Sequence, residues 1–484
     1  MLFSLSFNGN KEDYLICERG KRRSAFAPIK RILLAIPGMP GAYLESTDTE
    51  VRIIEQPIII KADDRIGQRI LEEDLAAWLI TKEPAPLIFE EEPKRVYYAV
   101  VDGSLNIDDI AKFGKGTITF ICLDPRKYSS TLKQPTYSYL QDDFNNPIVF
   151  DVGGTTDTAP IITVTLKEAT TYLDIIGEKD YMRIGQPTAI DTTPKPEKEI
   201  VFLDGLETTV GWANAQNMDI DGGVVSGTML SNNYQFYSSD YGTGSDWHGP
   251  AKIKSIGQSL TDFEAEITLT LRNEDFKKHG RVEIYLLDSN KQAVCKLALK
   301  DISQGQDGNY AELRVGDNVN NHFIINERGN SWQSWVDFEG ILRISRVGNK
   351  WTAYVAKFDA NKNHINTRLV EWTDVANLYT RKPANVVVHV GAHGTIATNT
   401  MSMSEVKVSK INTLTDAQVP YIGVSGDVFV FDHKAEKITK NGELFTKKDF
   451  GARFFKFEKG YPSYLFSPSE SIAEVKTEWR DAYL

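Results

Sequence analysis

The chain has 484 residues, of which 41% are hydrophobic and 25% are charged, so roughly two to four folded domains are expected. The formal net charge of −11 argues against a nucleic-acid-binding protein, which would carry a basic face. The three cysteines are far apart and lack metal-ligand spacing, and no apolar run is long enough to span a bilayer, so we expect neither disulfides nor membrane insertion.

The first 130 residues predict an α+β domain. Apolar residues between Ile66 and Leu79 recur at helical spacing, so we expect a helix from Asp64 to about Thr81. This helix lies within a series of β-runs, and a helix packed on a mostly antiparallel sheet is the expected outcome. The predicted strands are 52–61, 95–101 and 117–122.

Residues 131–195 and 416–484 together predict a second β-domain that is interrupted along the chain. Both segments consist of short β-runs between turn residues, such as the strand predicted at 161–166. The dipeptide Asn441-Gly442 is typical of a two-residue hairpin turn. We therefore expect strands of the first segment to pair with strands of the second in one sheet.

Residues 196–415 predict an inserted all-β domain with its own core. The run 262–271 alternates apolar and polar residues, and Gly348-Asn349 separates two further runs as a hairpin turn would. Many short strands with Gly and Asn in the turns indicate a sandwich or jelly roll. This insert also holds six of the eight tryptophans and six of the seven histidines.

Aromatic and polar residues gather in two parts of this insert, as a sugar-binding site requires. Aromatic rings pack on the apolar face of a sugar, and fixed polar groups bind its hydroxyls. Packing within the β-sandwich is the competing interpretation for each aromatic residue. The candidate carbohydrate-binding residues are Tyr237, Tyr241, Asp246, Trp247, His248, Trp332 and Trp335.

Catalytic and metal chemistry find less support in the sequence. Glu264 and Glu266 share one face of a predicted strand, where a glycosidase could use two carboxylates, but they also fit an ordinary solvent-facing row. His389 and His393 lie in a strand-like run, where four-residue spacing does not bring two ligands together as it does on a helix. No nucleotide-binding or nucleophile motif is present, so we expect no cofactor, no metal and no enzymatic activity.

The order of motifs in the first unit resembles the N-terminal belt domain of the distal tail proteins (Dit) of long-tailed, non-contractile phages. The resemblance begins at a basic loop, Gly20–Arg23, and continues through the helix that ends in Ala77-Trp78-Leu79. It includes Pro86–Glu90, Arg95–Val100 and Thr119–Pro125.

The interrupted domain resembles the galectin-like C-terminal domain of the same family. Asn145–Pro160 is similar to its entry, Gly426-Asp427 to its late strand, and Glu478-Trp479-Arg480 to its terminus. The insert is similar to concanavalin-like or laminin-G-like sandwiches, chiefly through Arg343–Trp351. Some members of the family carry carbohydrate-binding modules at this place.

The resemblance implies a mainly β structural protein at the distal end of the virion tail, synthesised in the host cytoplasm. It implies a homo-hexameric ring that joins the tail tube protein to the tail-tip hub or tail-associated protein. We expect the insert to bind host cell-wall polysaccharide and so to assist adsorption. Two alternatives remain open: a glycan-degrading insert, and a purely architectural insert that braces neighbouring tail proteins.

Overall fold

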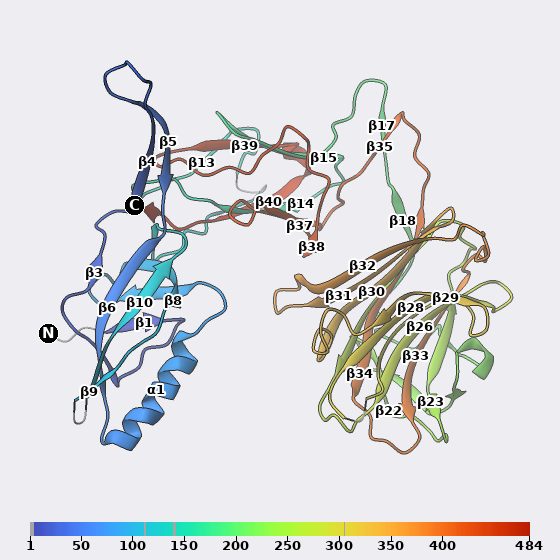
Figure 1. The fold of residues 1–484 in the computed structure, drawn as a ribbon. Helices are drawn as coiled ribbons and strands as arrows, with labels where there is room; N and C mark the ends of the chain where they lie inside the picture. Colours follow the sequence, from blue (N-terminus) through green and yellow to red (C-terminus); the bar gives the residue numbers. More distant parts are fainter. Residues whose placement is uncertain (1–3, 111–112, 139–141, 304) are drawn as a thin grey trace. The chain divides into compact units, whose positions relative to one another are not determined.

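The computed structural model describes residues 4–110, 113–138, 142–303 and 305–484, and its mainly β fold confirms the predicted fold class (Figure 1). These residues form two compact units. The first unit comprises Met1–Gly185, Gly423–Ile438 and Phe445–Leu484, and the second comprises Gln186–Ile422 and Thr439–Leu444. Within the described ranges, no helix is long and apolar enough to cross a membrane.

The N-terminal part of the first unit is a ten-stranded sheet with the central order β1-β7-β8-β10-β6-β2. β10 is longer than predicted because it pairs along its whole length with β6, from Phe113 opposite Lys61 to Cys122 opposite Arg52. The strands of this sheet are β1 (Leu5–Phe7), β2 (Leu15–Cys17), β3 (Arg22–Arg23), β6 (Arg52–Lys61), β7 (Ala85–Phe89), β8 (Arg95–Asp102), β9 (Asp108–Ile110), β10 (Phe113–Cys122), β11 (Lys127–Ser129) and β41 (Ala482–Tyr483).

The predicted helix is α1 (Arg65–Leu79). The carboxylate of Asp64 caps it by accepting a hydrogen bond from the amide of Gly67 at 2.7 Å. Leu75 and Leu79 are buried in the core of this sheet, as their helical spacing predicts. The helix ends two residues earlier than predicted, since the backbone of Ile80 is already extended.

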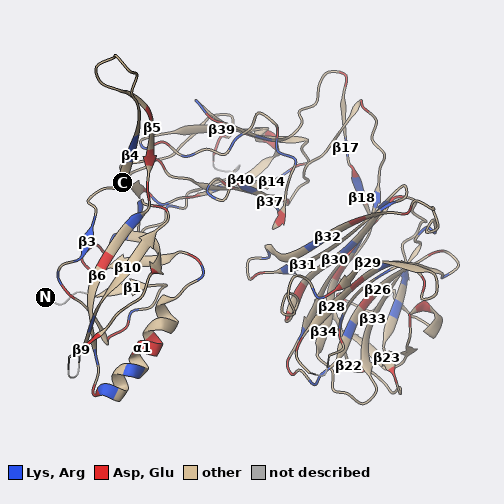
Figure 2. Ribbon diagram, viewed as in Figure 1, with Lys and Arg blue, Asp and Glu red and all other residues tan. Residues whose placement is uncertain are grey.

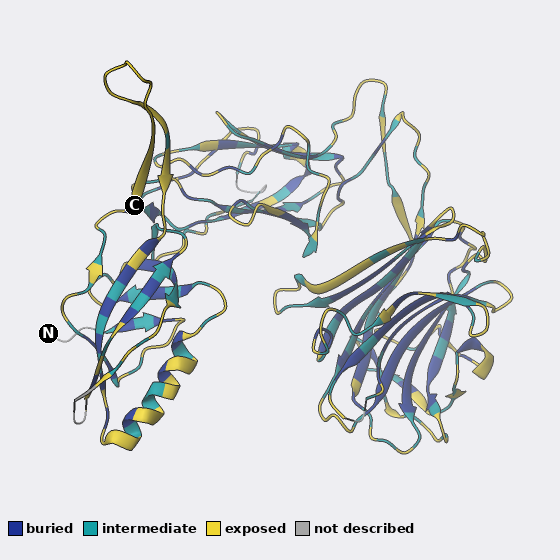
Figure 3. Cartoon of the chain, viewed as in Figure 1, coloured by how far each residue is buried: buried dark blue, intermediate teal, exposed yellow. Residues whose placement is uncertain are grey.

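A separate hairpin, β4 (Ile29–Leu34) and β5 (Tyr43–Thr49), belongs to the same unit. Nearly all of its residues are exposed, as the yellow colour in Figure 3 shows. Several of them are large and apolar, among them Leu33, Leu34 and Leu44. An exposed apolar surface of this kind is typical of a protein contact.

The interrupted domain forms two sheets, in the orders β12-β40-β14-β36-β37-β38 and β13-β39-β15-β16. β14 lies between β36 and β40, so strands from the two ends of the chain pair as predicted. The strands are β12 (Thr136–Ser138), β13 (Ile148–Val149), β14 (Ile161–Leu166), β15 (Tyr172–Gly177), β16 (Tyr181–Gly185), β36 (Val428–Asp432), β37 (Lys437–Lys440), β38 (Glu443–Leu444), β39 (Ser463–Ser467) and β40 (Ile472–Glu478).

The second unit is a sandwich of an eight-stranded and a nine-stranded sheet. The first follows β21-β22-β34-β25-β30-β31-β32, with β18 beside β34; its strands are β18 (Lys198–Asp204), β21 (Thr228–Ser231), β22 (Phe236–Asp240), β25 (Phe263–Arg272), β30 (Phe338–Val347), β31 (Lys350–Phe358), β32 (His364–Thr373) and β34 (Thr400–Ile411). The second follows β19-β24-β33-β26-β27-β28-β29; its strands are β19 (Ala213–Asn214), β20 (Val224–Val225), β23 (Trp247–Gly249), β24 (Ala251–Ser255), β26 (Gly280–Leu287), β27 (Ala293–Asp301), β28 (Asn309–Gly316), β29 (Asn321–Glu327) and β33 (Asn385–His393).

The core of the sandwich is apolar and comes from alternate residues of both sheets. Phe263 and Leu271 of β25 are fully buried against partners such as Ile284 and Leu297 of the nine-stranded sheet. The intervening residues of β26, β27 and β28 therefore lie on the opposite face of the nine-stranded sheet. We call this the polar face, because it carries charged side chains.

A short parallel ribbon begins and ends the second unit. β17 (Thr193–Lys195) pairs with β35 (Gln418–Pro420), with Thr193 opposite Gln418. The chain therefore enters and leaves the sandwich at adjacent positions. This is the geometry that an inserted domain needs.

Candidate functional site

Trp247 lies on the polar face at the edge of the nine-stranded sheet. It pairs with His393 of β33, and the two rings are 5.0 Å apart in an edge-to-face arrangement. The guanidinium of Arg281 lies 4.8 Å from the indole centre, and the carboxylate of Asp246 lies 3.1 Å from His393 Nε2. The structure thus brings Asp246 and Trp247 together, and it adds Arg281 and His393, which the sequence did not single out as partners.

The other residues of this predicted cluster lie elsewhere. His248 follows Trp247 in the strand and is 3% exposed, with its Nδ1 held 2.8 Å from the carbonyl oxygen of Asp246. Tyr237 belongs to β22 of the other sheet, where its neighbour Phe236 fills the core. Tyr241 packs against that core, and burial raises its pKa to about 12. The structure therefore separates these three side chains from the partly exposed ring of Trp247, and their role in sugar binding stays a prediction.

Trp335 is a core residue, which corrects its assignment as a sugar-binding candidate. Its side chain is 1% exposed and leaves no face for a sugar ring. Its indole N–H donates to the carbonyl oxygen of Asn366 at 3.1 Å, and Asn309 donates to its carbonyl oxygen at 2.6 Å. The packing interpretation holds for this tryptophan.

Trp332 is partly exposed and stacks on Arg328. The Arg328 guanidinium lies 3.8 Å from the centre of this indole and 4.8 Å from the ring of Tyr310 on β28. Gly308 allows the approach, because a Cβ atom there would lie 2.3 Å from Trp332 Nε1. Trp332 therefore lies beside the nine-stranded sheet, to which Trp247 also belongs.

The pairing of β26 with β27 and of β27 with β28 brings further basic and aromatic side chains together on the polar face. Arg281 of β26 lies opposite Lys300 of β27, and Lys300 lies opposite Tyr310, with its Nζ 5.7 Å from the tyrosine ring. Directly opposite residues share a face, so these side chains form one line across the strands. We call the line the aromatic–basic row, and it consists of Trp247, Arg281, Lys300, Tyr310, Arg328 and Trp332.

The aromatic–basic row is extended and accessible. Four strand spacings separate β23 from β28, which corresponds to roughly 20 Å. All members except Arg281 are partly exposed. Such a row could contact several sugar rings of one chain.

Ion pairs on the same face hold the row in place. Glu283 is fully buried and contacts Arg281 at 3.3 Å, Lys296 at 2.9 Å and His389 at 2.9 Å. Burial opposes its ionisation, but Arg281 and Lys296 outweigh burial and hold the pKa of Glu283 well below its usual range. Burial lowers the pKa of His389, so this imidazole stays neutral. These buried ion pairs restrict Arg281 and thereby the position of the row.

The carboxylates considered for catalysis do not have the properties of a general acid. Burial would raise the pKa of Glu266, but Arg343 and Lys407 outweigh it and bring the value to about 2. Glu264 is paired with Lys198 at 2.6 Å. A glycosidase general acid needs a raised pKa instead.

Among the described residues, Asp301 does not provide a catalytic acid, and the histidines do not provide a metal site. Burial raises the pKa of Asp301, but its side chain is fully enclosed and bound by Asn273 and Asn399. It is therefore out of reach of a substrate. Across the described parts of the chain, no three His, Cys, Asp or Glu side chains are placed to hold a metal.

Loops at one end of the second unit form a pocket of about 600 Å³ that the sequence did not reveal. Asn320, Leu378 and Tyr379 contribute to its lining. Asp317 organises one wall: its carboxylate accepts from the amides of residues 319 and 320 and pairs with Arg381 at 3.1 Å. The polar groups mainly satisfy one another, so we consider this pocket secondary to the row.

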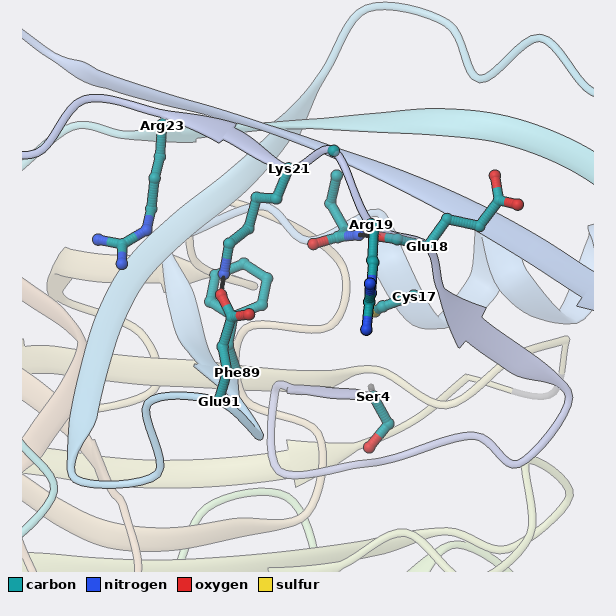
Figure 4. Close-up of a pocket in the computed structure, with 10 residues that line it drawn as sticks. Ser4, Cys17, Glu18, Arg19, Lys21, Arg23, Phe89 and Glu91 are labelled. Carbon is teal, nitrogen blue, oxygen red and sulfur yellow. Dashed lines mark hydrogen bonds and ion pairs between the residues drawn. The ribbon is translucent and has the colours of Figure 1, made fainter. Parts of the chain in front are cut away.

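Figure 4 shows a polar pocket of about 290 Å³ in the first unit. Lys21 lies 3.8 Å from the centre of the Phe89 ring and pairs with Glu91. Burial lowers the pKa of Lys21 to about 8, with Arg23 adding to the effect. The lysine covers the aromatic ring, so this pocket offers no platform for a sugar. The basic run of the sequence is thus neutralised by neighbouring glutamates.

Two family models match this chain. Residues 9–122 match the phage tail protein RIFT-related domain, and residues 391–483 match the siphovirus-type tail component, C-terminal domain. The distal tail protein of Bacillus phage SPP1 is 28% identical over 131 residues. That alignment covers 26% of this chain and 51% of the relative, so the chain spans about half the length of the curated relative it matches.

Solved structures with related folds include two from distal tail proteins. The SPP1 Dit structure has a TM-score of 0.33 and 20% identity, covering 38% of this chain and 75% of its own. The CBM2 module of the evolved Dit of Lactobacillus casei BL23 phage J-1 has a TM-score of 0.39 and 17% identity, covering 46% and 99%. A family GH16 endo-β-1,3(4)-glucanase has a TM-score of 0.32 and 8% identity, covering 51% and 98%.

The two family models lie in the same order as the two halves of a distal tail protein. One matches the N-terminal sheet and helix, and the other ends in the strands that pair with β14. The sequence relative is itself a distal tail protein. Both the N-terminal and the C-terminal part of the chain are therefore similar to siphophage distal tail proteins.

Proposed function

We propose that this chain is a distal tail protein that assembles at the tail tip and that its insert, residues 196–415, binds polysaccharide on the host cell surface. The aromatic–basic row carries the proposal. It places three aromatic rings and three cations on a partly exposed face, where buried ion pairs restrict Arg281. Sugar sites combine apolar rings with a few fixed polar groups, and this row provides both.

The first unit supplies the structural part of the proposed function. The exposed apolar hairpin β4–β5 supports a protein contact, and a head-to-tail contact that closes gives a ring. We propose a homo-hexamer that joins the tail tube protein to the tail-tip hub or tail-associated protein in the virion. The similarity to distal tail proteins supports these partners.

Adsorption through such a ring would depend on avidity. Six weak sites that face one cell surface engage together, because binding of one copy raises the effective concentration of the others. An individual site therefore needs only modest affinity.

Replacing Trp247 by alanine in the full-length protein tests the proposal. Loss of this ring should weaken the affinity of a single site for host polysaccharide by about tenfold, since one stacking surface disappears. Retention of fluorescent protein on host cells, with free sugars as competitors, measures this. Tyr234→Ala is the matched control, because Tyr234 is 78% exposed but lies outside the row. Unchanged retention of folded Trp247→Ala would contradict the proposal.

The same samples address the two alternatives. We propose that the insert has no enzymatic activity, because Arg343 and Lys407 keep Glu266 ionised, Glu264 is paired with Lys198, and Asp301 is enclosed. Release of reducing ends from host polysaccharide would show a depolymerase instead. A folded wild-type protein that host cells do not retain would favour an architectural insert.

A further inference from the structure

Arg328 differs from an ordinary surface arginine in how it is held. Its guanidinium lies over the rings of Trp332 and Tyr310, at 3.8 and 4.8 Å from their centres. Its Nε is enclosed, while its terminal amino groups are not among the enclosed atoms. The two rings restrict the side chain and leave the terminal N–H groups facing outward.

Arg328 also lacks an oxygen partner within the structure. None of the ion pairs or hydrogen bonds among the described residues involves it, not even with Asp307, which precedes Gly308. Among the residues that the structure describes, six other arginines lie over aromatic rings, and each donates to a carbonyl or carboxylate oxygen or pairs with one. They are Arg52, Arg95, Arg183, Arg281, Arg343 and Arg346.

Within the ion-pair network of the polar face, cations outnumber carboxylates. On the polar face, an ion-pair network joins the four cations Arg281, Lys296, Lys300 and Arg314 to three carboxylates, Glu283, Glu312 and Asp221. Arg328 adds a fifth cation outside that network. In Figure 2, the strands of the nine-stranded sheet carry both blue segments, which mark Lys or Arg, and red segments, which mark Asp or Glu.

We propose that the Arg328 end of the aromatic–basic row is a subsite for an acidic group, a phosphate or a carboxylate, carried by the surface polysaccharide. The inference rests on the proposed function and specifies its ligand. A planar guanidinium binds both oxyanions through two parallel N–H···O bonds, and the two rings fix it in advance for such a contact. A neutral glycan would use the tryptophans but leave this cation without a partner.

Binding of the full-length protein to three defined polymers tests the subsite. Polygalacturonate carries carboxylates, poly(glycerol phosphate) carries phosphates, and dextran is neutral. We expect the wild type to bind at least one acidic polymer about tenfold or more tightly than dextran, as charge-assisted hydrogen bonds would give. The stronger of the two acidic polymers identifies the anion.

Substitutions assign that preference to one side chain. Arg328→Gln should abolish the preference without weakening dextran binding, and Arg328→Lys should restore part of it, because a lysine keeps the charge but not the planar fork. Arg368→Gln is the control, since Arg368 is an exposed arginine of the same domain that pairs with Glu327 at 2.7 Å. Melting curves of all variants verify folding.

The outcomes separate this inference from the proposed function. Equal binding of acidic and neutral polymers by both wild type and Arg328→Gln overturns the subsite and leaves glycan binding intact. Binding of no polymer and no host polysaccharide overturns the proposed function. In that case, phenylglyoxal labelling read by mass spectrometry decides the subsite: protection of Arg328, but not Arg368, by inorganic phosphate supports it, and equal labelling overturns it.

Discussion

Which face of a strand or turn a tryptophan occupies decides its role in this molecule. Trp247 and Trp332 lie on the polar face beside cations, whereas Trp335 points into the sandwich. From the sequence, all three were candidate sugar-binding residues, because each lies among polar and aromatic neighbours. Long-range register, rather than local composition, separates binding candidates from core residues.

Trp335→Ala should destabilise the second unit by about 3–5 kcal/mol, the usual effect of removing a buried indole. The substitution removes core contacts and a hydrogen bond to the carbonyl of Asn366. Urea denaturation monitored by circular dichroism measures the change. A change below about 1 kcal/mol would show that Trp335 is not part of the core.

Only part of the aromatic–basic row could be predicted from the sequence. Trp247 and Trp332 were predicted as candidates because aromatic and polar residues gather in their sequence neighbourhoods. Arg281 and Lys300 were missed, since they become neighbours only through the pairing of β26 with β27. A sequence without known strand register does not contain that information.

At the scale of elements, strong local patterns were reliable. The amphipathic stripe gave α1, and Gly348 and Asn441-Gly442 occupy turns with positive φ angles between paired strands. The hairpin β4–β5 was not predicted, because its exposed apolar residues lack an inward-facing alternation. A strand whose apolar side chains face a partner protein cannot be recognised by the burial pattern of its own chain.

His433, which follows β36, should make the stability of the first unit depend on pH. Burial lowers the pKa of its imidazole to about 3, and its Nδ1 accepts from the amide of Phe455 at 3.0 Å. The folded unit therefore keeps His433 neutral, while the unfolded chain takes up a proton below about pH 6.5. Stability is full above that pH and is lost as pH falls towards 3.

Between pH 6.5 and 5 this loss should reach about 2 kcal/mol, from 1.36 kcal/mol for each pKa unit. Hydrogen exchange of the β36 amides at several pH values measures it for this unit. His433→Gln should remove this part of the pH dependence. An equally steep dependence in that variant would assign the effect to other groups.

At the scale of the whole molecule, the chain has one domain sequence placed inside another. β14 pairs with both β36 and β40, so the two ends of the sequence must meet before this sheet is complete. The ribbon β17–β35 holds the entry and exit of the second unit side by side. We propose 131–195 and 416–484 as the two parts of the galectin-like domain on this basis.

The pairing of distant strands was predictable because both segments are made of short β-runs that neither could complete alone. The row and its unpaired Arg328 were not predictable, as they depend on five strands of the nine-stranded sheet and on one loop. Domain organisation follows from the order of patterns along the chain. A binding surface follows from the register between strands.

Replacing residues 196–415 by a short flexible linker tests whether the insert is a separate domain that binds host cells. The replacement is possible because β17 and β35 are already neighbours. We expect the shortened protein to fold and to show the oligomeric state of the full chain by light scattering. We also expect host cells to retain the full chain but not the shortened one. A shortened protein that fails to fold, or that host cells retain as strongly as the full chain, would contradict the proposal that the insert is a separate binding domain.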